Sequence, residues 1–460
     1  MQTVEQARES LKYKLGQIWE QPRPSLSDSY GAGIRRLEIP FPKTDLLTWL
    51  ENQPQPRKLY WADRTRKQKA AGVGVAFEMS EQIADSIIPF FDRINSSLQS
   101  SHPGIRYFGG IRFNPSLPAS EKWEVFNALR FWVPRFELSE VNDRTIFAIN
   151  FMVPQNGQME NEKALLDKEI DQIRFGDTRE VPGNIRVIEK FDIPVFRNWE
   201  ENVHASLEMF RRDELQKIVL ARESCLTLSR RLSPVSLMKK IAAQNGGAYN
   251  FLFQFADEIA FLGITPEQLY RRERSNIFSE AVAGTRRRGK NEREDVRLGR
   301  ELLNSEKDVR EHRWVSEMVK ETLQELCGKT DAVSAEQLLK LSNVQHLRTL
   351  FRGELKENVA EGKILKTFHP TPAVCGSPRN RALKKISELE RFDRGWYAGP
   401  VGWVGRNASE FAVAIRSALI SGNKLSVYAG AGIVTGSEPE AEWQELEDKI
   451  LNFTNLFDKR

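Results

Sequence analysis

Two ionisable residues stand beside apolar runs and could move protons in a reaction. Lys217 directly precedes the apolar residues 218–220, and Glu267 follows an apolar segment and a Thr-Pro turn in "FLGITPEQLY". A lysine in a partly desolvated cleft can act as a general base, although a lysine at a strand edge can also simply extend into water. Pro266 fixes the backbone, so Glu267 is either a rigidly presented carboxylate or the start of a helix, where the dipole favours an acid.

Two acidic pairs lie at helical spacing and could bind a metal ion. Asp308 and Glu311 are three residues apart in "SEKDVREHRW", and Glu442 and Glu445 are three residues apart in "EWQELEDK". Paired carboxylates are costly to bury alone, so each pair either faces solvent or is neutralised by a cation. Two such helices that converge would suit Mg²⁺, which prefers oxygen ligands and keeps several waters. His312 does not complete an H-E-x-x-H motif, so zinc is not expected.

Two further segments could bind an anion. Ala283, Gly284 and Thr285 form a small-residue turn before three arginines, and exposed backbone N–H groups in such a turn can hold an anion. The alternative is a tight hairpin with a solvated basic flank. Arg416 interrupts the apolar segment "FAVAIRSALI" and therefore needs a carboxylate, either from the protein or from a ligand. A bidentate guanidinium is well shaped for a substrate carboxylate.

The elements that must position these residues are mostly short strands. Apolar runs rich in Phe, Val and Ile, separated by turn residues, recur from "GVGVAFEM" to "YAGAGIV", while residues 293–326 and 438–457 have helical periodicity. Hairpins dominate over βαβ alternation, which predicts an α+β fold with large, mainly antiparallel sheets packed as a sandwich and helices outside. A polar segment suggests a boundary near residue 160, between a sheet-containing region 1–160, expected to belong to the same fold, and a catalytic region 161–460.

Composition excludes several classes of partner. The 68 basic and 63 acidic residues give a net charge of +5 without a basic block, so nucleic acid is not expected. The three cysteines show no CxxC spacing or secretory leader, which indicates a reducing, cytoplasmic compartment. No apolar run approaches the roughly 20 residues that span a bilayer, so no membrane partner is expected. Nothing in the sequence marks an oligomer, and a monomer is favoured.

In their order along the chain, the motifs resemble one family, the chorismate-utilising enzymes, and within it the isochorismate synthases. The resemblance runs from Lys217 to Lys449. It rests on "KIVLAR", "LGITPEQL", "SEAVAGTRRRG", "SEKDVREHRWV", "VQHL", "FHPTPAVCGSP", "ERFDRGWYAGPVGW", "AIRSAL" and "YAGAGIV...EWQELEDK". It implies the family's large α+β fold, chorismate as the substrate and Mg²⁺ as the cofactor.

The resemblance also implies a role for each matched residue. Lys217 matches the base that activates water for attack at C2 of chorismate, and Glu267 matches the acid that protonates the departing C4 hydroxyl. Glu311 and Glu445 match the Mg²⁺ ligands, with Asp308 and Glu442 as partners through water. The remaining matches are to substrate-binding positions: Gly284 and Thr285 for the ring carboxylate, Arg416 and Tyr397 with the backbone near Gly430 and Gly432 for the enolpyruvyl carboxylate, and His346 and Lys449 in the pocket lining.

The branch of the family is indicated by a few positions. Relatives that use ammonia usually carry Gln where Lys217 stands, and aminodeoxychorismate synthases resemble a pattern with Lys in place of Ala283. The form of "FHPTPAVCGSP" favours an isochorismate synthase over a salicylate synthase. The long N-terminal region is typical of enzymes that feed menaquinone or phylloquinone synthesis, with siderophore and salicylate pathways as alternatives. A non-catalytic member of the fold is the competing hypothesis from another class.

Overall fold

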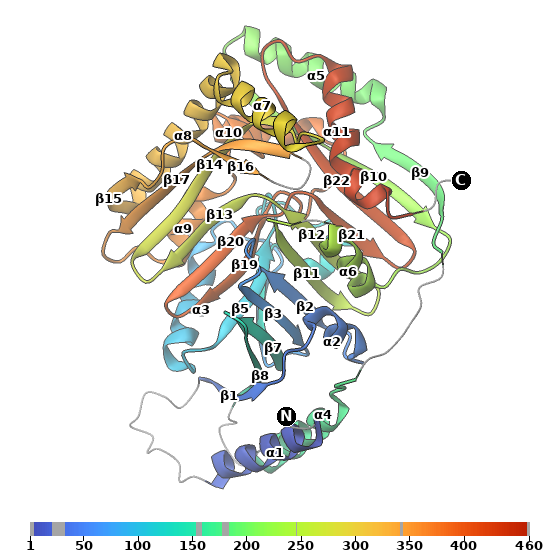
Figure 1. Ribbon diagram of the computed structural model, residues 1–460, viewed down its shortest axis with the longest axis vertical. Helices are drawn as coiled ribbons and strands as arrows, with labels where there is room; N and C mark the ends of the chain where they lie inside the picture. The colour runs from blue at the N-terminus through green and yellow to red at the C-terminus, as the bar shows by residue number, and fades with distance from the viewer. Residues whose placement is uncertain are drawn as a thin grey trace.

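A computed structural model describes residues 4–20, 33–152, 159–176, 184–244, 246–340 and 344–457. Their strands form two large sheets, and every strand pair is antiparallel. The predicted α+β architecture of mainly antiparallel sheets is confirmed. Figure 1 shows the two sheets running side by side from the lower end of the molecule to the upper end, where several helices gather.

The first sheet has 12 strands in the described residues. In spatial order they are β1 (Ile34–Phe41), β8 (Arg144–Met152), β7 (Phe136–Val141), β3 (Gln68–Val73), β2 (Lys58–Ala62), β11 (Tyr249–Ala256), β12 (Ile259–Thr265), β21 (Ser417–Ser421), β22 (Lys424–Ile433), β10 (Lys217–Leu228) and β18 (Gly376–Ser377), with β9 (Val187–Ile193) also paired to β10.

The second sheet has 10 strands in the same part of the chain. They are β15 (Cys327–Ala332), β17 (Val344–Leu355), β14 (Asn276–Arg287), β13 (Gln268–Glu273), β20 (Ala408–Val413), β19 (Pro400–Gly405), β5 (Arg106–Ile111), β6 (Leu129–Val133) and β4 (Phe77–Glu81), with β16 (Gln337–Lys340) paired to β17. Strands from both sides of residue 160 pair in each sheet, as β2 does with β11 and β5 with β19. We infer that the two regions fold as one unit.

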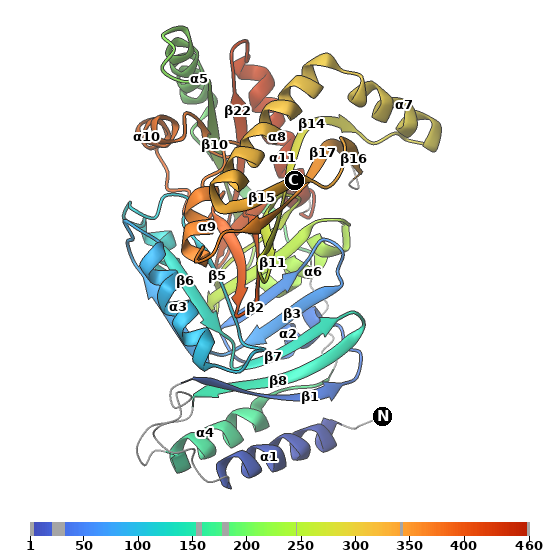
Figure 2. The same cartoon turned by 90° about the vertical axis from the view of Figure 1, so that its left-hand side faces the viewer.

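The helices cover the sheets from outside. They are α1 (Val4–Glu20), α2 (Leu46–Asn52), α3 (Ile88–Ser100), the 3₁₀ helix η1 (Glu121–Phe126), α4 (Met159–Gln172), α5 (Phe196–Arg211), α6 (Pro234–Gln244), α7 (Glu292–Leu303), α8 (Glu306–Leu326), α9 (Glu361–Phe368), α10 (Arg379–Leu389) and α11 (Pro439–Thr454). Figure 2 shows α1 and α4 together beneath β1, at the opposite end from α5, α7, α8, α10 and α11. None of the helices in the described ranges is long and apolar enough to cross a membrane.

One helical prediction needs correction. The periodic segment 293–326 is two helices, α7 and α8, because Ser305 interrupts it as an N-cap, with its hydroxyl accepting a hydrogen bond from the backbone N–H of Asp308 at 3.3 Å. The break directs α8 across β14 and β17, while α11 packs on β22. The acidic residues predicted to bind a metal therefore lie on two helices that pack on different sheets.

Large aromatic side chains fill the space between the sheets. Trp132 of β6 contacts Phe253 of β11 with ring centroids 5.7 Å apart, and Trp396 contacts both Phe253, at 5.7 Å, and Phe126, at 5.4 Å. Trp132 and Trp396 are fully buried. Because such rings bury large apolar areas in edge-to-face contact, they stabilise the sandwich and hold the two sheets in one arrangement.

The chain crosses between the sheets at two adjacent places. It passes from β12 to β13 through Pro266 and Glu267, and from β20 back to β21 through residues 414–416. The backbone N–H of Val413 donates to the Glu267 carbonyl at 3.1 Å, and the N–H of Ile264 donates to the Arg416 carbonyl at 3.0 Å. These bonds tie the two crossings together, so Glu267 and Arg416 are held near one another by rigid elements rather than by free loops.

Candidate active site

Lys217 begins β10, where the strand meets the short β18. Its ammonium lies 5.9 Å from the centre of the Trp314 ring on α8, a distance typical of a cation–π contact. Its side chain also passes over Gly432 of the neighbouring strand β22, and a Cβ at Gly432 would stand only 3.1 Å from the Lys217 Cε. A glycine at that position therefore leaves the lysine room to extend toward the site.

Glu267 is held at the first crossing by its own turn. Its N–H donates to the Thr265 hydroxyl at 3.2 Å, and that hydroxyl donates to the Val413 carbonyl at 2.6 Å. Burial raises the pKa of the Glu267 carboxyl to about 7 and the Glu280 carboxylate adds to the effect, whereas Arg64 and Lys217 oppose it. Glu267 can therefore hold a proton near neutral pH, as a general acid must.

Glu267 opens onto a pocket that lies beside the apolar face of α8. The cavity volume of this pocket is about 90 Å³. Its lining includes Glu267, Glu280, Trp314, Met318, Phe368 and Ala373. The segment from Phe368 to Ala373 belongs to the "FHPTPAVCGSP" motif, so this motif supplies one wall beside the acid.

Arg416 occupies the second crossing in a strained backbone conformation, with φ of +51°. A non-glycine residue in this region costs on the order of 1 kcal/mol, and the tie to Ile264 holds it there. The guanidinium donates to the Lys449 carbonyl at 3.2 Å, but within the described residues no carboxylate forms an ion pair with it. Burial lowers the pKa of Arg416, so the side chain is a partly desolvated cation available to a carboxylate.

Tyr397 lies against β22 beside Arg416. Its ring stacks on Tyr428 with centroids 5.3 Å apart, and a Cβ at Gly430 would stand 2.9 Å from its hydroxyl oxygen. The ammonium of Lys449, on α11, donates to the Gly430 carbonyl at 2.8 Å. Gly430 and Gly432 thus form part of a strand, where they make space for the hydroxyl of Tyr397 and the stem of Lys217.

His346 and Thr285 face one another across β17 and β14 at a β-bulge. Gly284 takes the extra position with φ of +68°, and a Cβ there would stand 3.1 Å from the Asp308 Cβ. The Nδ1 atom of His346 lies 3.2 Å from the Gly284 carbonyl oxygen and 3.0 Å from the Thr285 hydroxyl. Burial lowers the pKa of His346 to about 4, so the ring is neutral near pH 7.

Charge effects link these separate groups into one site. Arg416 acts on the pKa of both His346 and Tyr397, and Glu267 acts on the pKa of Tyr397. The charge of Lys217 in turn lowers the pKa of Glu267. The predicted base, acid and carboxylate-binding residues therefore lie within electrostatic range of one another.

The acidic residues of α8 and α11 have mixed surroundings. Asp308 accepts from Arg286 Nη2 at 2.7 Å, and Glu445 is paired with Lys449. Burial raises the pKa of Glu442, and Lys307 on α8 is close enough to oppose it, which places the start of α8 near α11. The side chain of Glu311 lies outside the described residues. Among the side chains that the structure describes, no three acidic, His or Cys residues are arranged to hold a metal.

Comparison with known proteins identifies the family. The profile described as "Chorismate binding enzyme" matches residues 27–457. This chain belongs to the chorismate-binding enzyme family. It is 33% identical to a chloroplastic isochorismate synthase of Catharanthus roseus over 92% of this chain and 81% of that protein, and 32% identical to an isochorismate synthase of Haemophilus influenzae over 97% of both. The solved menaquinone-specific isochorismate synthase of Escherichia coli superposes with a TM-score of 0.85 at 29% identity, covering 98% of this chain and 99% of that one.

The candidate site adjoins an ion pair that the sequence did not single out. Arg394 and Glu390, in "ERFDRGWYAGPVGW", are almost fully buried and form a bidentate pair. Arg394 also donates to the carbonyl of Val219 at 2.7 Å and to that of Val374 at 2.9 Å. The pair therefore joins β10, just after Lys217, to the loop that forms the wall beside Glu267. The i, i+4 spacing of opposite charges was the available signal.

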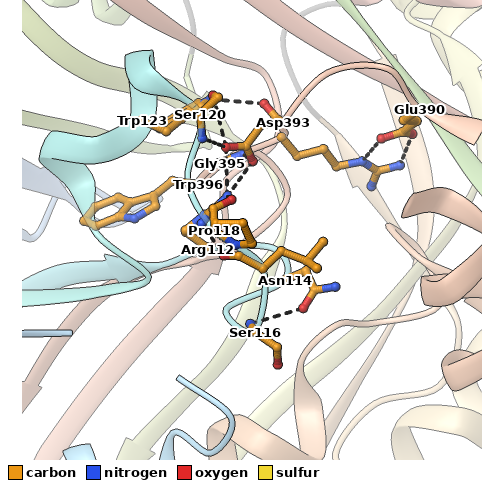
Figure 3. Close-up of polar contacts among 12 residues, drawn as sticks. Arg112, Asn114, Ser116, Pro118, Ser120, Trp123, Glu390, Asp393, Gly395 and Trp396 are labelled. Atoms are coloured by element: carbon orange, nitrogen blue, oxygen red, sulfur yellow. Dashed lines mark hydrogen bonds and ion pairs between the residues drawn. The ribbon is translucent and has the colours of Figure 1, made fainter. Parts of the chain in front are cut away.

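A second ion pair, between Asp393 of the same motif and Arg112, anchors the segment before Tyr397 (Figure 3). The Asp393 carboxylate accepts from Arg112 Nη2 at 2.7 and 2.8 Å, from the Ser120 N–H at 2.9 Å and from the Gly395 N–H at 2.8 Å. Arg112 and Ser120 come from the N-terminal third of the chain, so sequence spacing could not connect them to Asp393. The contact between Trp314 and Lys217 was not predicted either, because it depends on how α8 packs beside the start of β10.

Proposed function

We propose that this chain is an isochorismate synthase, which converts chorismate reversibly to isochorismate. The observation that carries the proposal is that Lys217 lies within electrostatic range of Glu267, whose carboxyl has a pKa raised to about 7 by burial. A base and a protonated acid held near each other on rigid elements are what an exchange of one hydroxyl position for another requires. The isochorismate synthases among the relatives support the same reaction.

The mechanism assigns one proton transfer to each residue. Lys217, acting as the general base in its unprotonated form, takes a proton from a water molecule as the water oxygen bonds to C2 of chorismate. The ring double bonds shift, the bond from C4 to its hydroxyl breaks, and Glu267 gives its proton to the departing oxygen. One water enters and one leaves, so the reaction is an isomerisation.

The remaining residues would orient the two carboxylates of the substrate. Arg416, which lacks a carboxylate partner among the described residues, and the hydroxyl of Tyr397 are suited to the enolpyruvyl carboxylate. The bulge at Gly284 and Thr285 offers backbone N–H groups to the ring carboxylate, with neutral His346 behind it. Lys449 holds the Gly430 carbonyl and keeps α11 against β22.

The acidic helices fit a Mg²⁺ ion in part. Glu442, whose pKa is raised by burial, and Glu445 offer the oxygen ligands that this cation prefers, and Glu311 on α8 would complete the set. Asp308 fits less directly, because its charge is already balanced by Arg286. When bound, Mg²⁺ would neutralise the ring carboxylate of the substrate.

We further propose that the product feeds quinone synthesis, since the solved relative that covers 98% of this chain is described as menaquinone-specific. The three cysteines of the chain are free, in keeping with the reducing, cytoplasmic compartment expected from the sequence.

The test is a product assay with matched variants. Purified protein incubated with chorismate and Mg²⁺ should form isochorismate, resolved by chromatography. Salicylate and pyruvate as the main products would instead identify a salicylate synthase, and no turnover would indicate a non-catalytic member of the family. Lys217→Gln should abolish water addition while the thermal unfolding temperature stays near that of the parent protein. Full activity in that variant would refute the assignment of the base.

A further inference from the structure

An arginine from the N-terminal half reaches the turn that carries Glu267. Arg64 lies between β2 and β3, more than 200 positions before that turn along the chain. Its Nη1 atom donates to Glu280 Oε2 at 2.8 Å, and its Nη2 atom donates to the other oxygen of Glu280 and to the Pro266 carbonyl. The side chains of Arg64 and Glu280 are 13% and 2% exposed, so the ion pair is largely shielded from solvent.

Glu280 and Glu267 share the same pocket wall. Both line the cavity beside α8, and the Glu280 charge raises the pKa of the Glu267 carboxyl while Arg64 lowers it. Two nearby carboxylates in a partly desolvated cleft disfavour each other's ionised form, whereas a cation beside them favours it. The balance between Arg64 and Glu280 therefore acts directly on the charge state of Glu267.

The other groups around this pair hold it in place. Arg64 lies 5.2 Å from the centre of the Tyr249 ring, and the Tyr249 hydroxyl donates to Glu410 at 2.9 Å. Gln268, next to Glu267, donates to the same hydroxyl at 2.6 Å. The charged and titratable groups that act on Glu267 are Lys217 from β10, Glu280 from β14 and Arg64 from the β2–β3 turn, with Tyr397 also within electrostatic range.

We propose that the Arg64–Glu280 ion pair positions Glu267 and sets how readily it releases its proton during the reaction. Arg64 fixes the Pro266 carbonyl and thereby the direction in which Glu267 points, while Glu280 places its carboxyl group in the same pocket wall as the acid. Both are positioning residues, since they act through Glu267. The inference rests on the proposed role of Glu267 as general acid.

The two charges predict opposite effects on the pH profile. The acid must be protonated, so kcat/KM falls as pH rises through the pKa of Glu267 in the free enzyme. Arg64→Gln removes the cation that favours the ionised form of Glu267, so Glu267 holds its proton longer and the descending limb should move up by about 1 pH unit. Glu280→Gln removes the carboxylate and keeps the Arg64 cation, which favours the ionised form of Glu267, so the limb should move down by about 1 pH unit. The double variant should lie between them.

The experiment measures kcat/KM for chorismate from about pH 5 to about pH 9 with the full chain and Mg²⁺. Arg64→Lys keeps the charge and should keep the limb near its original position. Arg271→Gln, at a half-buried arginine paired with Glu273, is the control for loss of a cation and should leave the limb unchanged. Glu280→Asp keeps the pair but withdraws the carboxylate by one methylene group, and it should lower the limb by a smaller amount even if the Gln variants do not fold.

Opposite displacements by the two Gln variants, or the smaller downward shift in Glu280→Asp, would support the proposal. An unmoved limb, or displacement in one common direction, would overturn it, because a purely structural role would change kcat/KM equally at all pH values. If the parent protein itself forms no isochorismate, the proposed function fails first, and that outcome is distinct from an active parent whose variants show no shift.

Discussion

Gly432→Ala should impair catalysis by displacing Lys217 while sparing the fold. The new Cβ would stand 3.1 Å from the Lys217 Cε and 3.6 Å from its nitrogen. Restoring an ordinary carbon–carbon contact of about 3.5 Å requires the lysine to retreat by about 0.4 Å. Since a misplacement of about 1 Å can cost about 100-fold in rate, we expect kcat to fall about sixfold, which corresponds to about 1.1 kcal/mol.

The assay compares this variant with two other glycine substitutions. Gly430→Ala would place a Cβ 2.9 Å from the Tyr397 hydroxyl, so it should mainly raise KM for chorismate. Gly328→Ala, in β15, meets no atom within 4 Å and should leave both constants unchanged. Steady-state kinetics and thermal unfolding of all three separate catalysis from folding. An unchanged kcat in Gly432→Ala, or a rise in KM alone, would refute the argument that the glycine makes room for the base.

Three other predictions concern charged groups. The pKa of Glu267 is raised from 4.5 to about 7 in the folded protein, so the unfolding free energy falls as pH rises from about 4.5 to about 7. Glu267→Gln should therefore stabilise the protein above pH 7, by at most about 3 kcal/mol, and should give no gain near pH 4. Denaturant unfolding at both pH values measures the difference. Glu390→Gln leaves Arg394 buried without its partner and should lower the unfolding free energy by about 3 kcal/mol; an unchanged midpoint would contradict the role of this pair. Chelation of Mg²⁺ should abolish turnover reversibly, and Glu445→Gln should raise the Mg²⁺ concentration needed for half-maximal rate, whereas equal activity with and without chelator would remove the metal from the mechanism.

The strands were predictable because their signals are local, whereas the roles of Lys217 and Glu267 came from the family resemblance and stay predictions. A strand such as β11 or β22 is marked by its own residues, and Lys217 and Glu267 stand at the ends of such strands. The break between α7 and α8 was missed, since helical periodicity continues through Ser305 while the cap depends on one side-chain hydrogen bond. The ion pair of Asp308 could not be predicted from the sequence either, because its partner Arg286 lies on a different element, β14.

By itself, the sequence determined the class of fold, the ordered set of motifs and the residue types that could exchange protons and bind carboxylates. These properties depend on neighbours along the chain. Only the tertiary structure decided that Gly430 and Gly432 make room for Tyr397 and Lys217, and that the N-terminal half supplies Arg64 to the turn before Glu267. Such contacts join residues far apart in sequence, and the energies of burial and charge that tune them exist only when the two sheets are packed together.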